Sequence, residues 1–547
     1  MKAVIFLIAA IIGVASSRLV SPVIEKAVLS DIAQKDDNCF HCEEEGEEAE
    51  KAPWYESGVF YQIYPRSFKD SDGDGNGDLK GIKEKLSHLK ELGVNGVWLS
   101  PVFKSPQADG GYDISSYVEI DPMYGTMEDM EALILEAKRL NIKLILDYVP
   151  NQKCPPNNWV SVFAGPAWTW NEKRGQFYLH QFDEKQPDLN YRNPAVLKAM
   201  KDVLRFWIEK GIDGFRVDAI NHVFEDKELR DEVTWEAEGD PTNWNEIYHN
   251  YTVDSEENYA VVYDWRDYLD YYTTVNQIDP KLMMTEAYTR EFDMTFRWFG
   301  DKDAGRHGAQ VAFNFVFIAD LNANSKNTDY DEKIKEWIGA VPEGSQANWV
   351  LGNHDQPRLA TRYEKNEEVL AWDDTKNAGF STGEKTWLPV HPDYAKVNLK
   401  AQKEAEASTF KLYQNLIKLR KLPVFKNGDY KMKAFEDTNA IGLLRHIGLD
   451  EVYAIALNLG DDETEVDLLS IEPAVKDSGY NKATLIVATN NYAMPEQNGE
   501  LVPHGTVDAD KFKLGGHQAV VMKLYSAGNG ITVSFALLFA VILRAFF

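Results

Sequence analysis

The chain has 547 residues and a formal net charge of −29. A chain of this length exceeds what one hydrophobic core usually supports, so we expect two or more domains. The acidic balance excludes a protein that holds nucleic acid through basic patches. It also argues against binding to an anionic membrane surface by such patches.

Residues 1–17 have the pattern of a secretory signal peptide. A basic start at Lys2 precedes an apolar run over 3–14, and small residues follow at 15–17. The rival interpretation is a membrane-spanning anchor, but the apolar run is short for one. Residues 18–53 have no apolar period and end in an acidic run, which predicts a solvated acidic leader.

Residues 526–547 have the pattern of a lipid-anchor signal. A small, polar stretch at 526–530 is followed by an apolar tail that runs to Phe547. This order predicts that the tail is cut off and replaced by a glycosylphosphatidylinositol (GPI) anchor. A tail that stays as a membrane anchor is the alternative. The expected location is the secretory pathway and then the extracellular face of the plasma membrane.

Between the two ends, strand-like and helix-like segments alternate. The expected helices are 79–92, 127–140 and 195–210, and the expected strands are 59–64, 95–99, 142–149, 214–217, 281–286, 311–318 and 348–351. Alternation at this spacing predicts βαβ units and a parallel sheet. Seven or eight such units predict an α/β fold, a (β/α)₈ TIM barrel with its active site at the carboxyl ends of the strands.

Charged residues stand at those strand ends. Arg216 and Asp218 share one face of the fourth strand, where the guanidinium would keep the carboxylate ionised. An isolated pair of this kind is more often a structural ion pair. Here, however, Asp147 and Glu286 end two other strands, and Asp355 follows the seventh. Two acids on either side of one bond are what glycoside hydrolysis requires.

Four segments resemble the signature regions of the α-amylase superfamily, glycoside hydrolase family thirteen. They are 147–151 (DYVPN), 214–218 (GFRVD), 285–288 (TEAY) and 352–357 (GNHDQP). Residues 377–381 (NAGFS) and 387–391 (WLPVH) are similar to motifs of the insect maltase-like α-glucosidases. With the anchor signal, the nearest resemblance is to the membrane-anchored midgut maltases of mosquitoes. The resemblance covers residues 54–525.

The resemblance implies a role for each matching residue. Asp218 would be the nucleophile, Glu286 the general acid and base, and Asp355 the stabiliser of the transition state. Residues implied to hold the terminal glucose are Arg216, His354, Asp109 and Tyr112, the last by stacking. The implied activity is retaining hydrolysis of terminal α-1,4-linked glucose from maltose- or sucrose-type sugars at the midgut surface.

A glycine-rich loop carries oxygen ligands at alternate positions, namely Asp70, Asp72, Asp74, Asn76 and Asp78. This pattern favours a hard cation, Ca²⁺ or Mg²⁺. An EF-hand is the competing interpretation, but its closing glutamate is absent because Gly81 stands there. A solvated acidic turn is the other alternative. The resembling family has a structural metal loop at this place.

The expected domains are a catalytic barrel over 54–425 and an all-β C-terminal sandwich over 426–525. Short strands at 440–445, 452–458, 484–487 and 519–524 predict the sandwich. An irregular insert at 151–194 matches the family's small B domain. Asn250 begins the one N-glycosylation sequon, Asn250-Tyr251-Thr252.

Two departures from the family predict impaired activity. Gln152 stands where the family has a sugar-binding histidine. No apolar strand run lies between Ala360 and Asn377, apart from the short 369–372, so the eighth barrel strand is expected to be missing. The alternative function is therefore a catalytically weak or inactive surface binding protein, such as the receptor of a bacterial toxin.

Overall fold

The computed structural model describes residues 54–55 and 58–526 with internal gaps. The gaps are residues 108, 149–156, 172, 175, 237–238, 241, 323, 344, 346, 358–370, 490–491 and 493–503. The predicted signal peptide, acidic leader, lipid-anchor signal and Gln152 lie outside the described residues. Among the helices that are described, none has the length and apolar character needed to cross a membrane.

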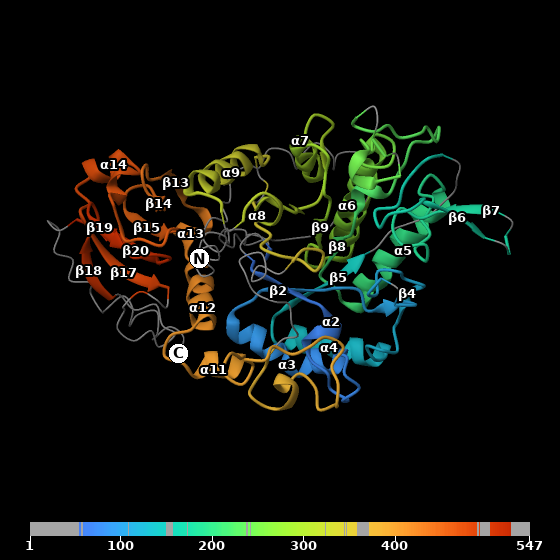
Figure 1. The fold of residues 1–547 in the computed structure, drawn as a ribbon, viewed down its shortest axis with the longest axis horizontal. Coiled ribbons are helices and arrows are strands. Elements are labelled where there is room, and N and C mark those ends of the chain that lie inside the picture. Colours follow the sequence, from blue (N-terminus) through green and yellow to red (C-terminus); the bar gives the residue numbers. More distant parts are fainter. Residues whose placement is uncertain are drawn as a thin grey trace, which may run out of the picture.

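A sheet of six parallel strands lies at the centre of the molecule (Figure 1). In spatial order its strands are β1 (Phe60–Ile63), β2 (Gly96–Leu99), β5 (Lys143–Tyr148), β8 (Gly214–Val217), β9 (Leu282–Thr285) and β12 (Val311–Ala312). The connecting helices are α3 (Leu79–Leu92), α4 (Met127–Arg139), α5 (Pro194–Lys210) and α6 (Glu256–Asn276). This arrangement confirms the predicted TIM-barrel fold and its first five strands.

Local signals set the ends of these helices. Asp78 caps α3 by accepting a hydrogen bond from the N–H of Gly81, and Gly93 ends that helix in the left-handed region at φ +99°. Thr126 and Asp129 form a capping box at the start of α4. Such caps satisfy backbone groups that the helix leaves unpaired, so the boundaries follow from sequence.

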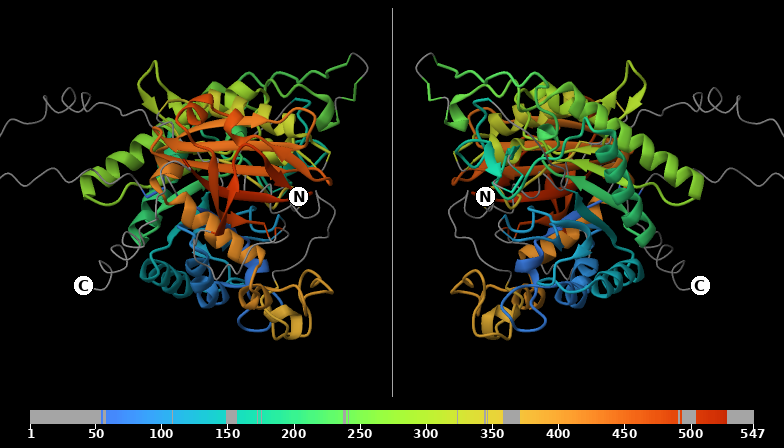
Figure 2. Two further views of the ribbon diagram at one scale, coloured as in Figure 1. Left: turned by 90° about the vertical axis from the view of Figure 1, so that its left-hand side faces the viewer. Right: turned by 90° about the vertical axis from the view of Figure 1, so that its right-hand side faces the viewer.

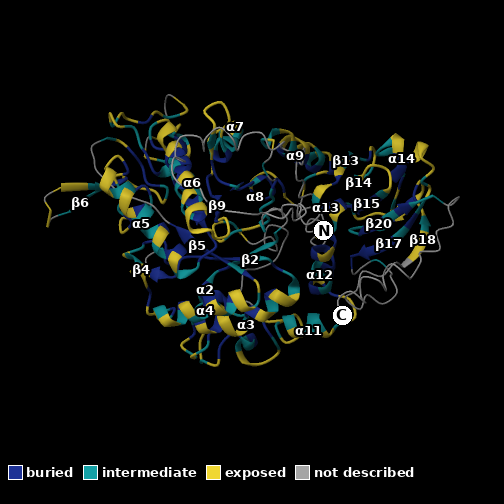
Figure 3. Cartoon of the chain, turned by 180° about the vertical axis from the view of Figure 1, so that it is seen from behind, coloured by how far each residue is buried: buried dark blue, intermediate teal, exposed yellow. Residues whose placement is uncertain are grey.

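Successive side chains along each strand face two different hydrophobic cores in turn. Outward-facing residues pack with the helices, and they include Val97, Leu99, Leu144, Leu146, Phe215, Val217 and Met283. Inward-facing residues fill the barrel interior, and they include Trp98, Ile145, Leu282, Met284 and Val311. Figure 3 shows the sheet as buried and the outer faces of the helices as exposed. Because this alternation continues along each strand, Arg216, Asp218 and Glu286 fall on the inward-facing side.

Two predicted strands differ from the structure. The sixth, expected over 311–318, ends at Ala312 and gives way to α8 (Val316–Ala319), while residues 348–351 form no strand. Asn314 and Asn348 explain both changes. The N–H of Asn314 donates to Asn348 Oδ1 over 3.0 Å, and Asn348 Nδ2 donates to the carbonyl of Ala312 over 2.5 Å. These side chains replace ladder hydrogen bonds, so regular pairing stops.

The predicted absence of an eighth strand concerns residues 358–370, which lie outside the described residues. Ala371 and Trp372, the end of the short candidate run, are described and belong to no strand. Trp372 is buried instead, and its Nε1–H donates to the carbonyl of Phe68 over 2.6 Å. Within the described part of the chain, β1 and β12 are therefore the two edges of the sheet.

An all-β C-terminal sheet confirms the predicted fold class of this region and faces the viewer in the left view of Figure 2. Its antiparallel strands, in spatial order, are β13 (Asp429–Ala434), β14 (Ala440–Ile447), β15 (Glu451–Asn458), β20 (Ala519–Tyr525), β17 (Lys482–Ala488) and β18 (His504–Asp508). One face packs on α9 (Asn327–Ala340), α12 (Thr409–Arg420) and α13 (Pro423–Asn427). The other face carries a ribbon of β16 (Thr464–Val466) and β19 (Phe512–Leu514). The domain boundaries remain predictions.

The remaining elements are short. They are α2 (Pro65–Phe68), β3 (Phe103–Lys104), β4 (Ser116–Ile120), α7 (Phe292–Phe296), β10 (Gly300–Asp301), β11 (Arg306–His307), α11 (Leu399–Glu404) and α14 (Pro473–Asp477). Within the predicted insert, β6 (Trp168–Asn171) and β7 (Gln176–Leu179) form a hairpin that projects from the barrel (Figure 1).

Candidate active site

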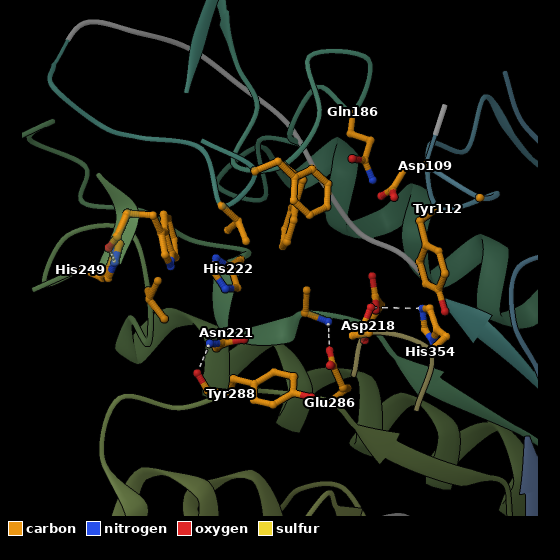
Figure 4. A pocket seen from close by; sticks show the side chains of 18 of the residues that line it. Asp109, Tyr112, Gln186, Asp218, Asn221, His222, His249, Glu286, Tyr288 and His354 are labelled. Carbon is orange, nitrogen blue, oxygen red and sulfur yellow. Dashed lines mark hydrogen bonds and ion pairs between the residues drawn. The ribbon is translucent and has the colours of Figure 1, made fainter. Parts of the chain in front are cut away.

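A cavity of about 540 Å³ opens where the strands of the barrel end (Figure 4). Asp218 follows β8, Glu286 follows β9, and Asp355 lies in the segment after residues 348–351; all three line the cavity. The structure thus brings together the three acids that the sequence places at separate strand ends.

Arg216 is the cation at the centre of these acids, and only 1% of its side chain is exposed. Its Nη1 donates to Asp147 Oδ1 over 2.8 Å and also pairs with Asp218. Its Nη2 lies 3.5 Å from Glu286 Oε2. Burial alone would lower the pKa of Arg216, but the three carboxylates raise it well above its ordinary value. Arg216 is therefore permanently charged.

Asp147 contacts the residues of the site without lining the cavity itself. It is buried, and it accepts hydrogen bonds from Trp98 Nε1 over 3.1 Å and from the hydroxyl of Tyr112 over 3.0 Å. The guanidinium of Arg216 also lies 4.8 Å from the centre of the Trp98 ring. Asp147 does not line the cavity, so we assign it the positioning of Arg216 and Tyr112.

The two central acids differ in their readiness to hold a proton. Burial raises the pKa of Asp218, although Arg216 opposes the rise. Burial raises the pKa of Glu286 to about 8, and the negative charges of Asp218 and Asp355 add to the effect of burial. At neutral pH, Glu286 therefore keeps its proton while Asp218 is the better candidate for the charged form.

Ala219 joins the two acids through its backbone. It adopts a left-handed conformation at φ +41°, which is uncommon for a residue with a side chain. In this conformation its N–H donates to Glu286 Oε2 over 2.9 Å. A sparsely populated backbone conformation beside the reacting groups is typical of a functional site, where the surroundings compensate its cost.

His354 and Tyr112 form a stacked pair at one side of the cavity, with ring centres 4.9 Å apart and planes 13° apart. Gln62 Nε2 lies 3.2 Å from His354 Nδ1. Burial and the charge of Arg216 lower the pKa of His354 to about 4, so the imidazole is neutral at physiological pH. Tyr112 was predicted to stack on a sugar; the structure shows that one face of its ring packs on His354.

Asp355 and Asp109 occupy the more open part of the site. Asp355 has 46% of its side chain exposed, and its Oδ1 lies 3.5 Å from His354 Nε2. Burial raises the pKa of Asp109 to about 6, while a hydrogen bond from Gln186 opposes the rise. Figure 4 places Asp109 and Gln186 together above Tyr112. Both residues line the cavity, and Gln186 was not predicted from sequence.

The sequence analysis also missed residues from the loops after β8 and β9. These loops add Asn221, His222, Trp244, His249, Tyr288 and Arg290 to the cavity wall. Their one sequence signal is that they follow strand ends, where TIM barrels place their active sites. Gln152, which was predicted at this site, lies outside the described residues.

Three of the five predicted metal ligands converge. Carboxylate oxygens of Asp70, Asp72 and Asp78 lie within 4.8 Å of one another. The N–H of Asp74 lowers the pKa of Asp72, but desolvation and the neighbouring carboxylates outweigh that bond and raise it. Crowded carboxylates of this kind fit a hard cation that neutralises them.

The predicted ligands also accept hydrogen bonds from the protein. Asp70 accepts from the N–H groups of Gly73 and Gly75, and Asp78 accepts from those of Ser71 and Gly81. Asn76 Oδ1 accepts a hydrogen bond from Arg66 Nε over 2.8 Å, and Asp74 Oδ1 accepts one from the N–H of Asn76 over 2.7 Å. The carboxylate of Asp74 does not belong to the converging group, and the side chain of Asn76 is held by Arg66.

Comparisons with known proteins agree with this geometry. Residues 62–154, 151–371 and 367–428 match the family described as alpha amylase, catalytic domain. The chain is 40% identical to Maltase 1 of Drosophila virilis, over 76% of this chain and 80% of that protein. It is 36% identical to the salivary alpha-glucosidase of Aedes aegypti, over 87% of this chain and 96% of that protein.

A solved structure of similar fold is the trehalose-6-phosphate hydrolase of Bacillus licheniformis. It is 27% identical to this chain with a TM-score of 0.71, and the match covers 87% of this chain and all of that one.

We predict that Glu286→Gln makes stability less dependent on pH. Glu286 has a pKa of about 8 in the folded protein and an ordinary value of 4.5 otherwise, so the native state binds this proton more tightly. The proton on Glu286 contributes its full stabilisation below the unfolded-state pKa of 4.5, and this stabilisation is lost as the pH rises through the folded-state pKa of about 8. Between them, the unfolding free energy of wild type should fall by about 1.4 kcal/mol per pH unit relative to Glu286→Gln.

Urea unfolding at ~pH 5, 7 and 9 measures this difference, and Glu384→Gln on the exposed surface is the matched control. Parallel stability curves for wild type and Glu286→Gln would show that Glu286 does not hold its proton in this range.

Proposed function

The chain belongs to the family of α-amylase catalytic domains, and from this membership we propose that it is an α-glucosidase. It removes terminal α-1,4-linked glucose from maltose- or sucrose-type sugars with retention of configuration. The observation that carries the proposal is the pairing of Asp218 and Glu286 across one buried cation, with Glu286 holding a proton at neutral pH.

In the first step, an Asp218 oxygen attacks the anomeric carbon of the terminal glucose. The bond to the leaving-group oxygen breaks, and Glu286 gives its proton to that oxygen. A glucosyl ester of Asp218 results. Arg216 keeps Asp218 ionised before the attack and stabilises it when the ester breaks.

In the second step, Glu286 takes a proton from water as the water oxygen attacks the same carbon. Glucose leaves with its original configuration, and both acids return to their starting protonation states. Asp355 supplies a negative charge near the positive charge that develops on the sugar ring, and His354 Nε2 lies 3.5 Å from its Oδ1.

The alternative is a catalytically weak or inactive surface protein, such as the receptor of a bacterial toxin. The enzyme is favoured because all three acids line one cavity. A binding role on another surface does not require Glu286 to be buried with a raised pKa. The impairment expected from Gln152 and from a missing eighth strand stays a prediction.

We predict that the chain releases α-glucose from maltose slowly, below about 1 per second. Asp218→Asn should lower kcat by a further three orders of magnitude or so, because an amide is a poor nucleophile at this position. Proton NMR of the first glucose released measures its configuration. Asp202→Asn on α5, where the side chain is 39% exposed and lies outside the cavity, is the matched control.

Several outcomes would contradict these statements. Turnover in the ordinary range of about 1–10³ per second would show that the activity is not impaired. Near-normal turnover by Asp218→Asn would show that Asp218 is not the nucleophile. A wild-type protein that is folded by circular dichroism but hydrolyses no α-glucoside would favour the binding protein.

We further propose that Asp70, Asp72 and Asp78 hold Ca²⁺ or Mg²⁺ as a structural ion. Support comes from their convergence at the N-terminus of α3, where Asp78 is also the helix cap. Chelator should lower the melting temperature, because an ion that binds only the folded state stabilises it. Asp72→Asn should show a smaller shift with chelator than wild type does. An identical melting curve with and without chelator would leave only a solvated acidic turn.

The location is proposed from the two chain ends, as a GPI-anchored glycoprotein on the extracellular surface of midgut cells. Asn250, the proposed glycosylation site, is exposed in the structure. Phosphatidylinositol-specific phospholipase should release the protein from membranes. An epitope placed after Phe547 that stays with membrane-bound protein would indicate a retained tail anchor instead.

A further inference from the structure

The cavity extends well beyond the acids. His249 marks its far end, opposite His354 in Figure 4. Trp244, Val253 and Arg290 also line the cavity, and Arg290 bonds Asn250, the neighbour of His249 in the chain. The rings of Trp244 and His249 lie 3.7 Å apart between centres, with 33° between their planes. Aromatic faces with a few fixed polar groups are typical of a ligand site. This end of the cavity thus has the composition of a binding surface for the part of a substrate beyond the reacting glucose.

Arg290 is the polar group fixed at this end. Its Nη1 donates to Asn250 Oδ1 over 2.6 Å, and its Nε lies 3.5 Å from Asp254 Oδ2. The backbone N–H of Arg290 donates to the same Asp254 oxygen over 2.8 Å. Asp254 is fully buried, whereas 26% of the Arg290 side chain is exposed. Arg290 is therefore anchored on one side and open on the other.

The anchoring contacts leave part of the guanidinium for a ligand. They engage Nε and Nη1, and among the described residues no contact to Nη2 is observed, so Nη2 can donate to a ligand. Because the buried carboxylate of Asp254 balances the charge of Arg290, the pair is better suited to neutral hydroxyl groups than to a second anion. Sugar hydroxyls are such acceptors, and the rings of Trp244 and His249 line the same cavity.

We propose that Arg290 is a specificity-determining residue that hydrogen-bonds the leaving-group sugar, and that Asn250 and Asp254 are its positioning residues. The proposal rests on the proposed function, since it assigns the far end of the same cavity. Arg290 follows Glu286 by four residues, and Glu286 must stand beside the leaving-group oxygen to protonate it. Glu286 and Arg290 line one cavity, so a sugar attached to that oxygen lies in the same cavity as Arg290.

Asn250 thereby has a second role besides being the proposed glycosylation site. Arg290 uses its Oδ1, whereas a glycan is attached to its Nδ2. Substitutions that remove the sequon thus fall into two groups. Asn250→Asp keeps an oxygen for Arg290, and Asn250→Ala does not.

The test compares two substrates that form the same glucosyl ester. Maltotriose has leaving-group sugars, and α-glucosyl fluoride has none. Arg290→Met should lower kcat/KM for maltotriose about tenfold, since a hydrogen bond from a charged donor is lost, and should change that for the fluoride by less than about twofold. Equal losses on both substrates, or no loss on either, would overturn the proposal.

The two Asn250 variants provide the matched control, because neither can be glycosylated there. Asn250→Ala should reproduce part of the maltotriose defect, about threefold, and Asn250→Asp should not, while both hydrolyse the fluoride like wild type. If the two variants behave alike toward maltotriose, Asn250 does not position Arg290.

A binding measurement distinguishes failure of the proposed function from failure of the inference about Arg290. If folded wild type hydrolyses neither substrate, that function fails, and calorimetry then decides the inference with maltotriose and glucose as ligands. Tighter binding of maltotriose than of glucose in wild type, lost in Arg290→Met, would support it. An unchanged ratio of the two dissociation constants, or no binding by wild type, would overturn it.

Discussion

The site depends on one buried guanidinium shared by three carboxylates. A charge buried as deeply as Arg216 is stable only when it is paired, and its partners are Asp147, Asp218 and Glu286. Three ionised acids around one cation would leave an excess of negative charge among largely buried side chains. The excess is relieved when one acid keeps a proton.

The distances indicate which acid keeps it. Asp147 lies 2.8 Å from Arg216 and Asp218 is in direct contact, but Glu286 lies 3.5 Å away. Burial raises the pKa of Glu286 to about 8, and it raises that of Asp147 to about 7 although Arg216 opposes the rise. Glu286 therefore holds its proton to the higher pH of these two acids. The proposed division between Asp218 as nucleophile and Glu286 as acid, which glycoside hydrolysis requires, follows from burial together with the position of one arginine.

The rest of the barrel supports this cluster from one side. Trp98 lies beneath Arg216 and also donates to Asp147, and the apolar side chains of the barrel interior fill the space below. The upper wall has another origin, because it consists of loops. Ala219, His249 and Asp254 in those loops all have positive φ. Such conformations persist where packing compensates their cost, as they do beside the cavity.

The sequence by itself determined the strands, the helix ends and the acids at the strand ends. These depend on local rules: alternation along a strand, capping residues and glycine at helix ends. The end of β12 and the loss of a strand at 348–351 depend on a contact between Asn314 and Asn348, which no local pattern reveals.

Tertiary structure alone also decided which acid holds the proton, that His354 packs on Tyr112, and that Arg290 joins the cavity through Asn250 and Asp254. The physical reason is the same in each case. A pKa, a stacked pair or a loop contact depends on groups far apart in the chain that only the folded barrel brings within a few ångströms of one another.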